Sequence, residues 1–124
     1  MKISEILEIT KGKLLTPSIN LDTEVNGAFT GDLMSDVLAS IQPESALITG
    51  LSNPQVVRTA LIADIKLIIF GRGKMPAEET IELAIQESVP IIFSRYGLYE
   101  LSGRLMQAGL PSFEKEMSHS FDED

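Results

Sequence analysis

Two carboxylates, Asp32 and Asp36, stand four residues apart in the stretch GAFTGDLMSDVLAS, just after two glycines. On a helix this spacing places both side chains on one face, where they could bind a hard cation such as Mg²⁺. No third ligand is spaced nearby, and Asp32 also stands where an N-cap residue would start a helix, with Ser35 three residues later. Asp36 would then lie in the first turns, where the helix dipole favours a carboxylate. We therefore predict that Asp32 caps the helix, that Asp36 is solvated, and that no metal binds.

The segment Gly71-Arg-Gly-Lys74 is a second candidate, because glycine-containing turns before a helix can bind phosphate. It does not contain G-x-x-x-x-G-K-[ST], and Pro76 occupies the place of the third glycine in G-x-G-x-x-G. Its position is more informative, since ligands of open α/β sheets bind beyond the carboxyl ends of the strands. The residues predicted at three such ends are Thr49, Ser52 and Asn53; Gly71, Arg72, Gly73 and Lys74; and Ser94, Arg95 and Tyr96.

Three of the ten basic residues, Arg72, Lys74 and Arg95, fall on this one predicted edge. With neighbouring hydroxyls, two helix N-termini and Tyr96 as a stacking surface, the edge could bind a small anionic ligand. The alternative is that these are solvated loop residues in an acidic protein. The sequence leaves both interpretations open.

The composition excludes several classes of function. The chain has 18 acidic and 10 basic residues, a formal net charge of -8, and no cysteine. A surface this acidic repels phosphate backbones and anionic lipids, so we expect neither nucleic acid nor a membrane as a partner. The absence of cysteine removes disulfides and thiolate chemistry, and the single histidine, His119, lies in a polar tail. We expect a cytoplasmic protein without a cofactor.

The apolar pattern predicts the elements that would position these residues. Near-continuous apolar runs at 46–49, 66–70 and 90–93 are typical of parallel strands covered on both faces, and weaker strands are expected at 13–16 and 24–30. Helices are expected from a Ser4 cap to Gly12, and over 53–63, 76–87 and 98–108. This alternation predicts an α/β fold, a three-layer open, mainly parallel sheet of about four to five strands with helices on both faces. We expect one domain over residues 1–110 and an acidic, disordered tail over 111–124.

Beyond this pattern, the sequence resembles the DRTGG domain family from LDTEVNGAFTGDLMSDVLAS to about residue 107. The family pattern has an Asp-Arg-x-x-x-Gly-Gly segment, an Asp-Leu-Leu-Ser-Asp-Val-Met helix start and a Pro-x-Glu-Glu helix opening. The positions that match the first two motifs are Asp22, Gly27, Asp32, Ser35 and Asp36. Thr23 stands where the family has arginine, and Asn26-Gly27-Ala28 stands in place of Thr-Gly-Gly.

The resemblance implies a small regulatory module that commonly dimerises, similar to the N-terminal domain of HPr kinase/phosphorylase and without catalytic activity of its own. We therefore predict a non-enzymatic regulatory or protein-interaction module that acts as a homodimer, in contact through residues 29–37 or 98–106. The alternative is a domain that senses a nucleotide or phosphorylated metabolite at the predicted edge. An enzyme that uses Asp32 and Asp36 is the least favoured hypothesis.

Overall fold

The structure, a computed structural model, describes residues 1–116 of the chain. Its elements in chain order are α1 (Ile3–Thr10), β1 (Lys13–Leu14), β2 (Ala28–Thr30), α2 (Met34–Ser40), β3 (Ala46–Thr49), α3 (Gln55–Ala63), β4 (Leu67–Phe70), α4 (Glu78–Gln86), β5 (Ile91–Phe93) and α5 (Leu98–Gln107). No helix within residues 1–116 is long and apolar enough to cross a lipid bilayer.

The five strands form one sheet in the order β1-β5-β4-β3-β2. Strands β2 to β5 run parallel to one another, and β1 pairs antiparallel with β5 at one edge. Every residue of β3 and β4 is buried, because apolar side chains on both faces of a strand need cover on both sides. The predicted open, mainly parallel α/β sheet is confirmed.

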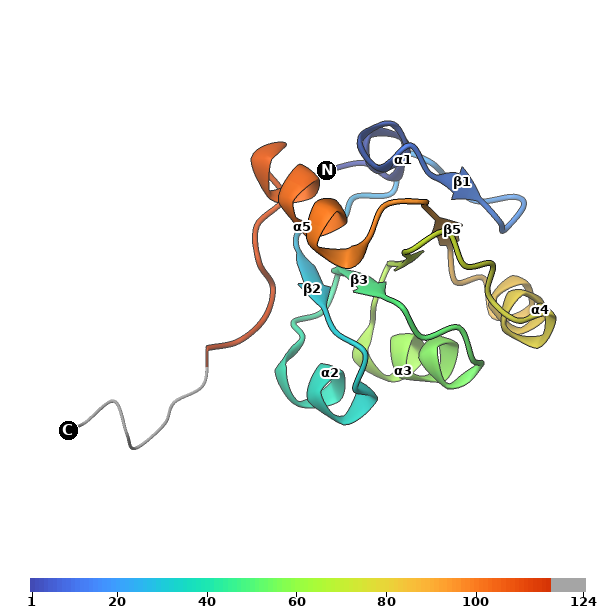
Figure 1. Cartoon of the computed structure of the whole chain (residues 1–124). Helices are drawn as coiled ribbons and strands as arrows, with labels where there is room; N and C mark the ends of the chain where they lie inside the picture. The colour runs from blue at the N-terminus through green and yellow to red at the C-terminus, as the bar shows by residue number, and fades with distance from the viewer. Residues whose placement is uncertain (117–124) are drawn as a thin grey trace.

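Helices cover both faces of the sheet (Figure 1), and the buried apolar residues form two clusters, one on each face. On one face, Val37 of α2, Val56 of α3 and Ala84 of α4 are fully buried against the sheet. On the other face, Ile6 of α1 and Leu105 of α5 are buried in the second cluster. The three-layer arrangement expected from the sequence is therefore the observed one.

The first helix starts differently from the prediction. Helix α1 begins at Ile3, so Ser4 lies inside the helix and its amide donates to the Leu21 carbonyl at 3.0 Å. The carboxylate of Glu5 instead accepts a hydrogen bond from the Lys2 amide at 3.0 Å. The predicted Ser4 cap is wrong, because the helix begins before Ser4 and the carbonyls of Thr23 and Leu21 accept hydrogen bonds from its first two amides.

The chain after α5 continues as an ordered strand-like segment along the outer edge of β2. The Ala28 amide donates to the Pro111 carbonyl at 2.9 Å, the Phe113 amide to the Ala28 carbonyl at 2.8 Å, and the Lys115 amide to the Ser40 carbonyl at 2.8 Å. These bonds differ from the disorder expected from residue 111 onward, because this segment pairs the otherwise open edge of β2. The rest of the expected tail, including His119, lies outside the described residues.

Candidate functional site

The carboxyl ends of β3, β4 and β5 lie side by side, as the predicted ligand edge requires, because these three strands are parallel neighbours. The loops that follow them are joined by backbone hydrogen bonds. The Arg72 amide donates to the Tyr96 carbonyl at 2.7 Å, and the Gly73 amide donates to the Ser94 carbonyl at 2.8 Å. The loop after β3 joins the same edge through the Ser52 carbonyl, which accepts a hydrogen bond from the Ala77 amide at 3.2 Å. The structure thus brings together the three segments selected from the sequence.

Several polar side chains of this edge already have protein partners. The buried Thr49 hydroxyl donates to Asp32 Oδ1 at 3.0 Å and accepts from the Leu51 amide at 3.2 Å. The buried Ser94 hydroxyl donates to the Thr10 carbonyl at 2.7 Å. Asn53 Oδ1 accepts from the Gln55 amide at 3.0 Å at the start of α3. These groups hold the loops in place, and the exposed cations remain as the groups of the edge that could contact an anion.

Asp32 does not cap helix α2. The N-cap position belongs to Leu33, and the helix has no side-chain cap. Asp32 Oδ1 instead accepts a hydrogen bond from the Gly50 amide at 2.8 Å, besides the one from Thr49. The predicted cap is therefore wrong, because the end of β3 offers two donors that hold the carboxylate away from its own helix.

Asp32 also pairs with a cation of the predicted edge. Its Oδ2 lies 3.7 Å from Arg72 Nη1, and a side chain at Gly50 would overlap the Arg72 guanidinium group. The Gly50 amide is the largest cause that lowers the pKa of Asp32, partial burial opposes it, and the Thr49 hydroxyl and the Arg72 charge lower the pKa further. Asp32 is therefore an ionised anchor that holds the ends of β3 and β4 and partly neutralises Arg72.

The other two cations of the edge, Lys74 and Arg95, are not paired with Asp32. Arg72 and Gly73 both have positive φ, of 67° and 66°, and an added β carbon at Gly73 would touch the Arg95 backbone. Lys74 and Arg95 are exposed. The Tyr96 ring, predicted to stack on a ligand, has the Arg104 guanidinium 4.1 Å from its centroid. One face of this ring is therefore already covered by a cation from α5.

Residues 5–108 match the family model of the DRTGG domain. The chain belongs to the DRTGG domain family. The crystal structure of the CBS and DRTGG domains of the regulatory region of Clostridium perfringens pyrophosphatase, complexed with its activator diadenosine tetraphosphate, has a similar fold, with a TM-score of 0.72 at 18% identity. The likeness covers 94% of this chain and 51% of that one, so the chain spans about half the length of that regulatory region. No curated protein matches the sequence.

The residues that carried the DRTGG resemblance lie at two opposite ends of the sheet. Asp32 follows the carboxyl end of β2, whereas the segment 22–27 leads into its amino end. Ser35 and Asp36 are exposed on α2, with Asp36 in the first helical turn as predicted. Among the described residues, no three Asp, Glu or His side chains lie together in a way that could hold a metal ion.

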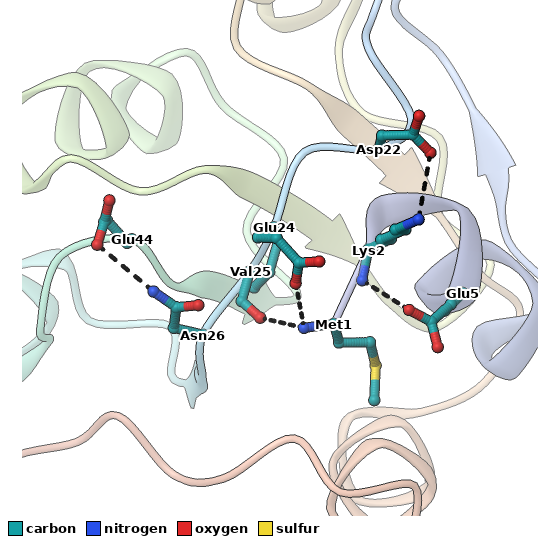
Figure 2. Close-up of polar contacts among 8 residues, drawn as sticks. All are labelled: Met1, Lys2, Glu5, Asp22, Glu24, Val25, Asn26 and Glu44. Atoms are coloured by element: carbon teal, nitrogen blue, oxygen red, sulfur yellow. Dashed lines mark hydrogen bonds and ion pairs between the residues drawn. The ribbon is translucent and has the colours of Figure 1, made fainter.

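At the amino end, the DRTGG segment is tied to the start of the chain (Figure 2). The Met1 ammonium group donates to the Glu24 carboxylate at 2.8 Å and to the Val25 carbonyl at 2.9 Å. The ammonium group is the largest cause that lowers the pKa of Glu24. Asp22 lies 3.8 Å from the Lys2 ammonium group.

Gly27, the family glycine, has a steric role that the sequence pattern did not reveal. Its α carbon is covered by the Phe113 ring, which an added β carbon would overlap. The amino-end residues of the motif therefore hold together the two ends of the described chain, and they do not reach the predicted ligand edge. The sequence signal for this contact is Phe113, an aromatic residue in a largely polar tail.

Proposed function

We propose that this DRTGG domain is a non-enzymatic regulatory or protein-interaction module that acts as a homodimer, and we include the expected cytoplasmic location in the proposal. Family membership supports the regulatory part, together with the fold shared with a regulatory region of a pyrophosphatase. The similarity to the N-terminal domain of HPr kinase/phosphorylase remains a prediction. The regulated partner would be another domain or protein that this module contacts.

The observation that carries the homodimer is the outer face of α5. Tyr99 is 93% exposed and Met106 is 60% exposed. Residues seven positions apart lie on the same helix face, so the two apolar side chains form one surface. Large apolar side chains gathered on one helix face are typical of a contact surface. Of the two predicted contact regions, we therefore favour residues 98–106.

Light scattering after size exclusion tests the homodimer. At micromolar concentration, we expect a mass of about twice the 13.6 kDa chain, and we expect the double variant Tyr99→Ser/Met106→Ser to be monomeric. Ile62→Ser is the matched control, because Ile62 is 73% exposed on α3, on the opposite face of the sheet. A monomeric wild-type chain would refute the homodimer, and loss of the dimer in the control would move the contact away from α5.

A second candidate function is the sensing of an anionic ligand at the edge formed by Arg72, Lys74 and Arg95. It is supported by the parallel arrangement of β3, β4 and β5 and by the nucleotide activator bound to the pyrophosphatase regulatory region. A thermal-shift screen of nucleotides, with and without Mg²⁺, would find such a ligand because binding raises the melting temperature. The double variant Arg72→Ala/Arg95→Ala should weaken the best ligand by about a hundredfold. Unchanged affinity would remove this candidate and leave the interaction module.

A further inference from the structure

A hollow of about 340 Å³ lies on the β1 side of the sheet, next to the predicted ligand edge. The charged residues that line it are Lys11, Lys13 and Arg95, and the aromatic ones are Phe93 and Tyr96. Among residues 1–116, no acidic residue lines it. Lys11 and Lys13 were not among the residues selected from the sequence, because the antiparallel strand that brings them here was predicted without its pairing partner.

Strand pairing explains why these cations converge. Lys13 is directly opposite Phe93 in the antiparallel pair of β1 and β5, and residues opposite one another project on the same face of a sheet. Lys11, two residues earlier, has a positive φ of 48° at the end of α1. Gly12 lies between them, and an added β carbon there would lie only 2.8 Å from Thr10 Oγ1 and 3.3 Å from the Phe93 carbonyl oxygen. The turn from α1 into β1 is thus held close against the end of β5, where Arg95 follows.

Within residues 1–116, the cations of the hollow lack the carboxylate partners that four other basic residues have. Lys2, Lys66, Arg72 and Arg104 each pair with a carboxylate. Within residues 1–116, no ion pair involves Lys11, Lys13 or Arg95. Three cations without a carboxylate around one hollow, in a chain of net charge -8, produce a local positive potential that attracts anions.

We infer that this hollow binds a nucleotide, with its phosphates on Lys11, Lys13 and Arg95 and its base against the aromatic side chains. Guanidinium and ammonium groups are the usual partners of phosphate oxygens. Phe93 is half-buried in the wall and Tyr96 is half-buried at the rim, so both can offer ring surface to a planar base. This site rests on the second candidate function, and it shares only Ser94, Arg95 and Tyr96 with the edge predicted from the sequence.

Calorimetric titration of the full chain with ATP, inorganic triphosphate and adenosine tests the site. We expect ATP to bind, inorganic triphosphate to bind about tenfold more weakly because it lacks the stacked base, and adenosine to show no binding. Equal affinity for ATP and triphosphate would refute the role of the aromatic side chains. No binding of ATP or triphosphate at millimolar concentration would refute both the site and the second candidate function.

Two variants that remove the same charge locate the site. Lys11→Gln/Lys13→Gln should lose about a hundredfold in ATP affinity, whereas Arg58→Gln/Lys115→Gln, at exposed positions elsewhere, should keep it within threefold. A melting temperature close to that of the wild type establishes that each variant is folded. If Arg72→Gln/Lys74→Gln loses the affinity and Lys11→Gln/Lys13→Gln keeps it, the ligand lies at the predicted edge and this inference is wrong. The homodimer is measured separately by light scattering, so its failure would not be mistaken for loss of this site.

Discussion

Replacing Asp32 tests whether this carboxylate anchors the end of β3 or merely starts a helix. Asp32 accepts hydrogen bonds from the Gly50 amide at 2.8 Å and the Thr49 hydroxyl at 3.0 Å, and lies 3.7 Å from Arg72. Hydrogen bonds to a charged group contribute about 1.5–3 kcal/mol each, and an exposed ion pair about 0–1 kcal/mol. Because 43% of the side chain is exposed, we take the lower end of this range. Asp32→Ala should cost about 2–3 kcal/mol of unfolding free energy.

Asp32→Asn should cost less, about 1 kcal/mol, because the amide oxygen can still accept both hydrogen bonds while the charge is lost. The matched control is Asp36→Ala, which removes an exposed carboxylate from the first turn of α2 and should cost at most about 0.5 kcal/mol. Urea unfolding followed by circular dichroism gives these differences as shifts of midpoint at constant slope.

A double-mutant cycle with Thr49→Val separates the anchor from a cap. The anchor predicts a coupling of about 1 kcal/mol between Asp32→Ala and Thr49→Val, because the two side chains share a hydrogen bond. A cap on α2 predicts no coupling, since Thr49 lies outside that helix. A coupling below the error of the measurement, or equal costs for Asp32→Ala and Asp36→Ala, would refute the anchor.

The remaining predictions use the pH dependence and two glycines. The pKa of Asp32 is lower in the folded state, so the stabilisation by its charge is fully present above the unfolded pKa of about 3.9 and is lost as the pH falls through the folded pKa. The difference in unfolding free energy between wild type and Asp32→Asn should therefore shrink below about pH 4. A difference that grows below this pH would contradict the prediction. Gly50→Ala should displace the Arg72 guanidinium group and couple with Arg72→Ala by about 0.5–1 kcal/mol in a urea cycle, whereas additive effects would contradict the contact. Gly27→Ala should displace the Phe113 ring, cost about 1–3 kcal/mol and speed hydrogen exchange of the Phe113 amide. Its control, Gly103→Ala in α5, meets no atom within 4 Å and should instead stabilise by about 0.5–1 kcal/mol.

The parts of the fold that could be predicted from sequence depend on local patterns. The central strands β3, β4 and β5 were predicted within one residue, because continuous apolar runs between helix signals are typical of buried parallel strands. The end of α5 was also predicted, since Gly109 adopts a positive φ of 106° directly after it.

The errors concern residues whose partners are distant in sequence. Asp32 has the pattern of an N-cap, but its donors lie 17 and 18 positions further along the chain. The segment after Pro111 is polar, yet it pairs with β2 through bonds that no local pattern encodes. For the same reason, Lys13 could not be assigned to the end of β5 until their antiparallel pairing was known.

The position of Asp32 offers a last test, which distinguishes the two candidate anion sites. Asp32 lies 3.7 Å from Arg72, so Asp32→Asn should free this arginine and raise the affinity of a nucleotide at the Arg72, Lys74 and Arg95 edge. Relief of one exposed ion pair corresponds to about 0–1 kcal/mol, or up to about fivefold in affinity.

The hollow beside β1 should not respond to this change. The Asp32 carboxylate is bound at the end of β3, and three strand spacings of about 4.8 Å separate β3 from β1, or about 14 Å. This distance exceeds the Debye length of about 8 Å at physiological ionic strength, so the charge of Asp32 is screened there. Titration of Asp32→Asn with ATP at physiological ionic strength should therefore give the wild-type affinity if the nucleotide binds on Lys11 and Lys13. A several-fold gain would place the ligand beside Arg72 instead and contradict the hollow.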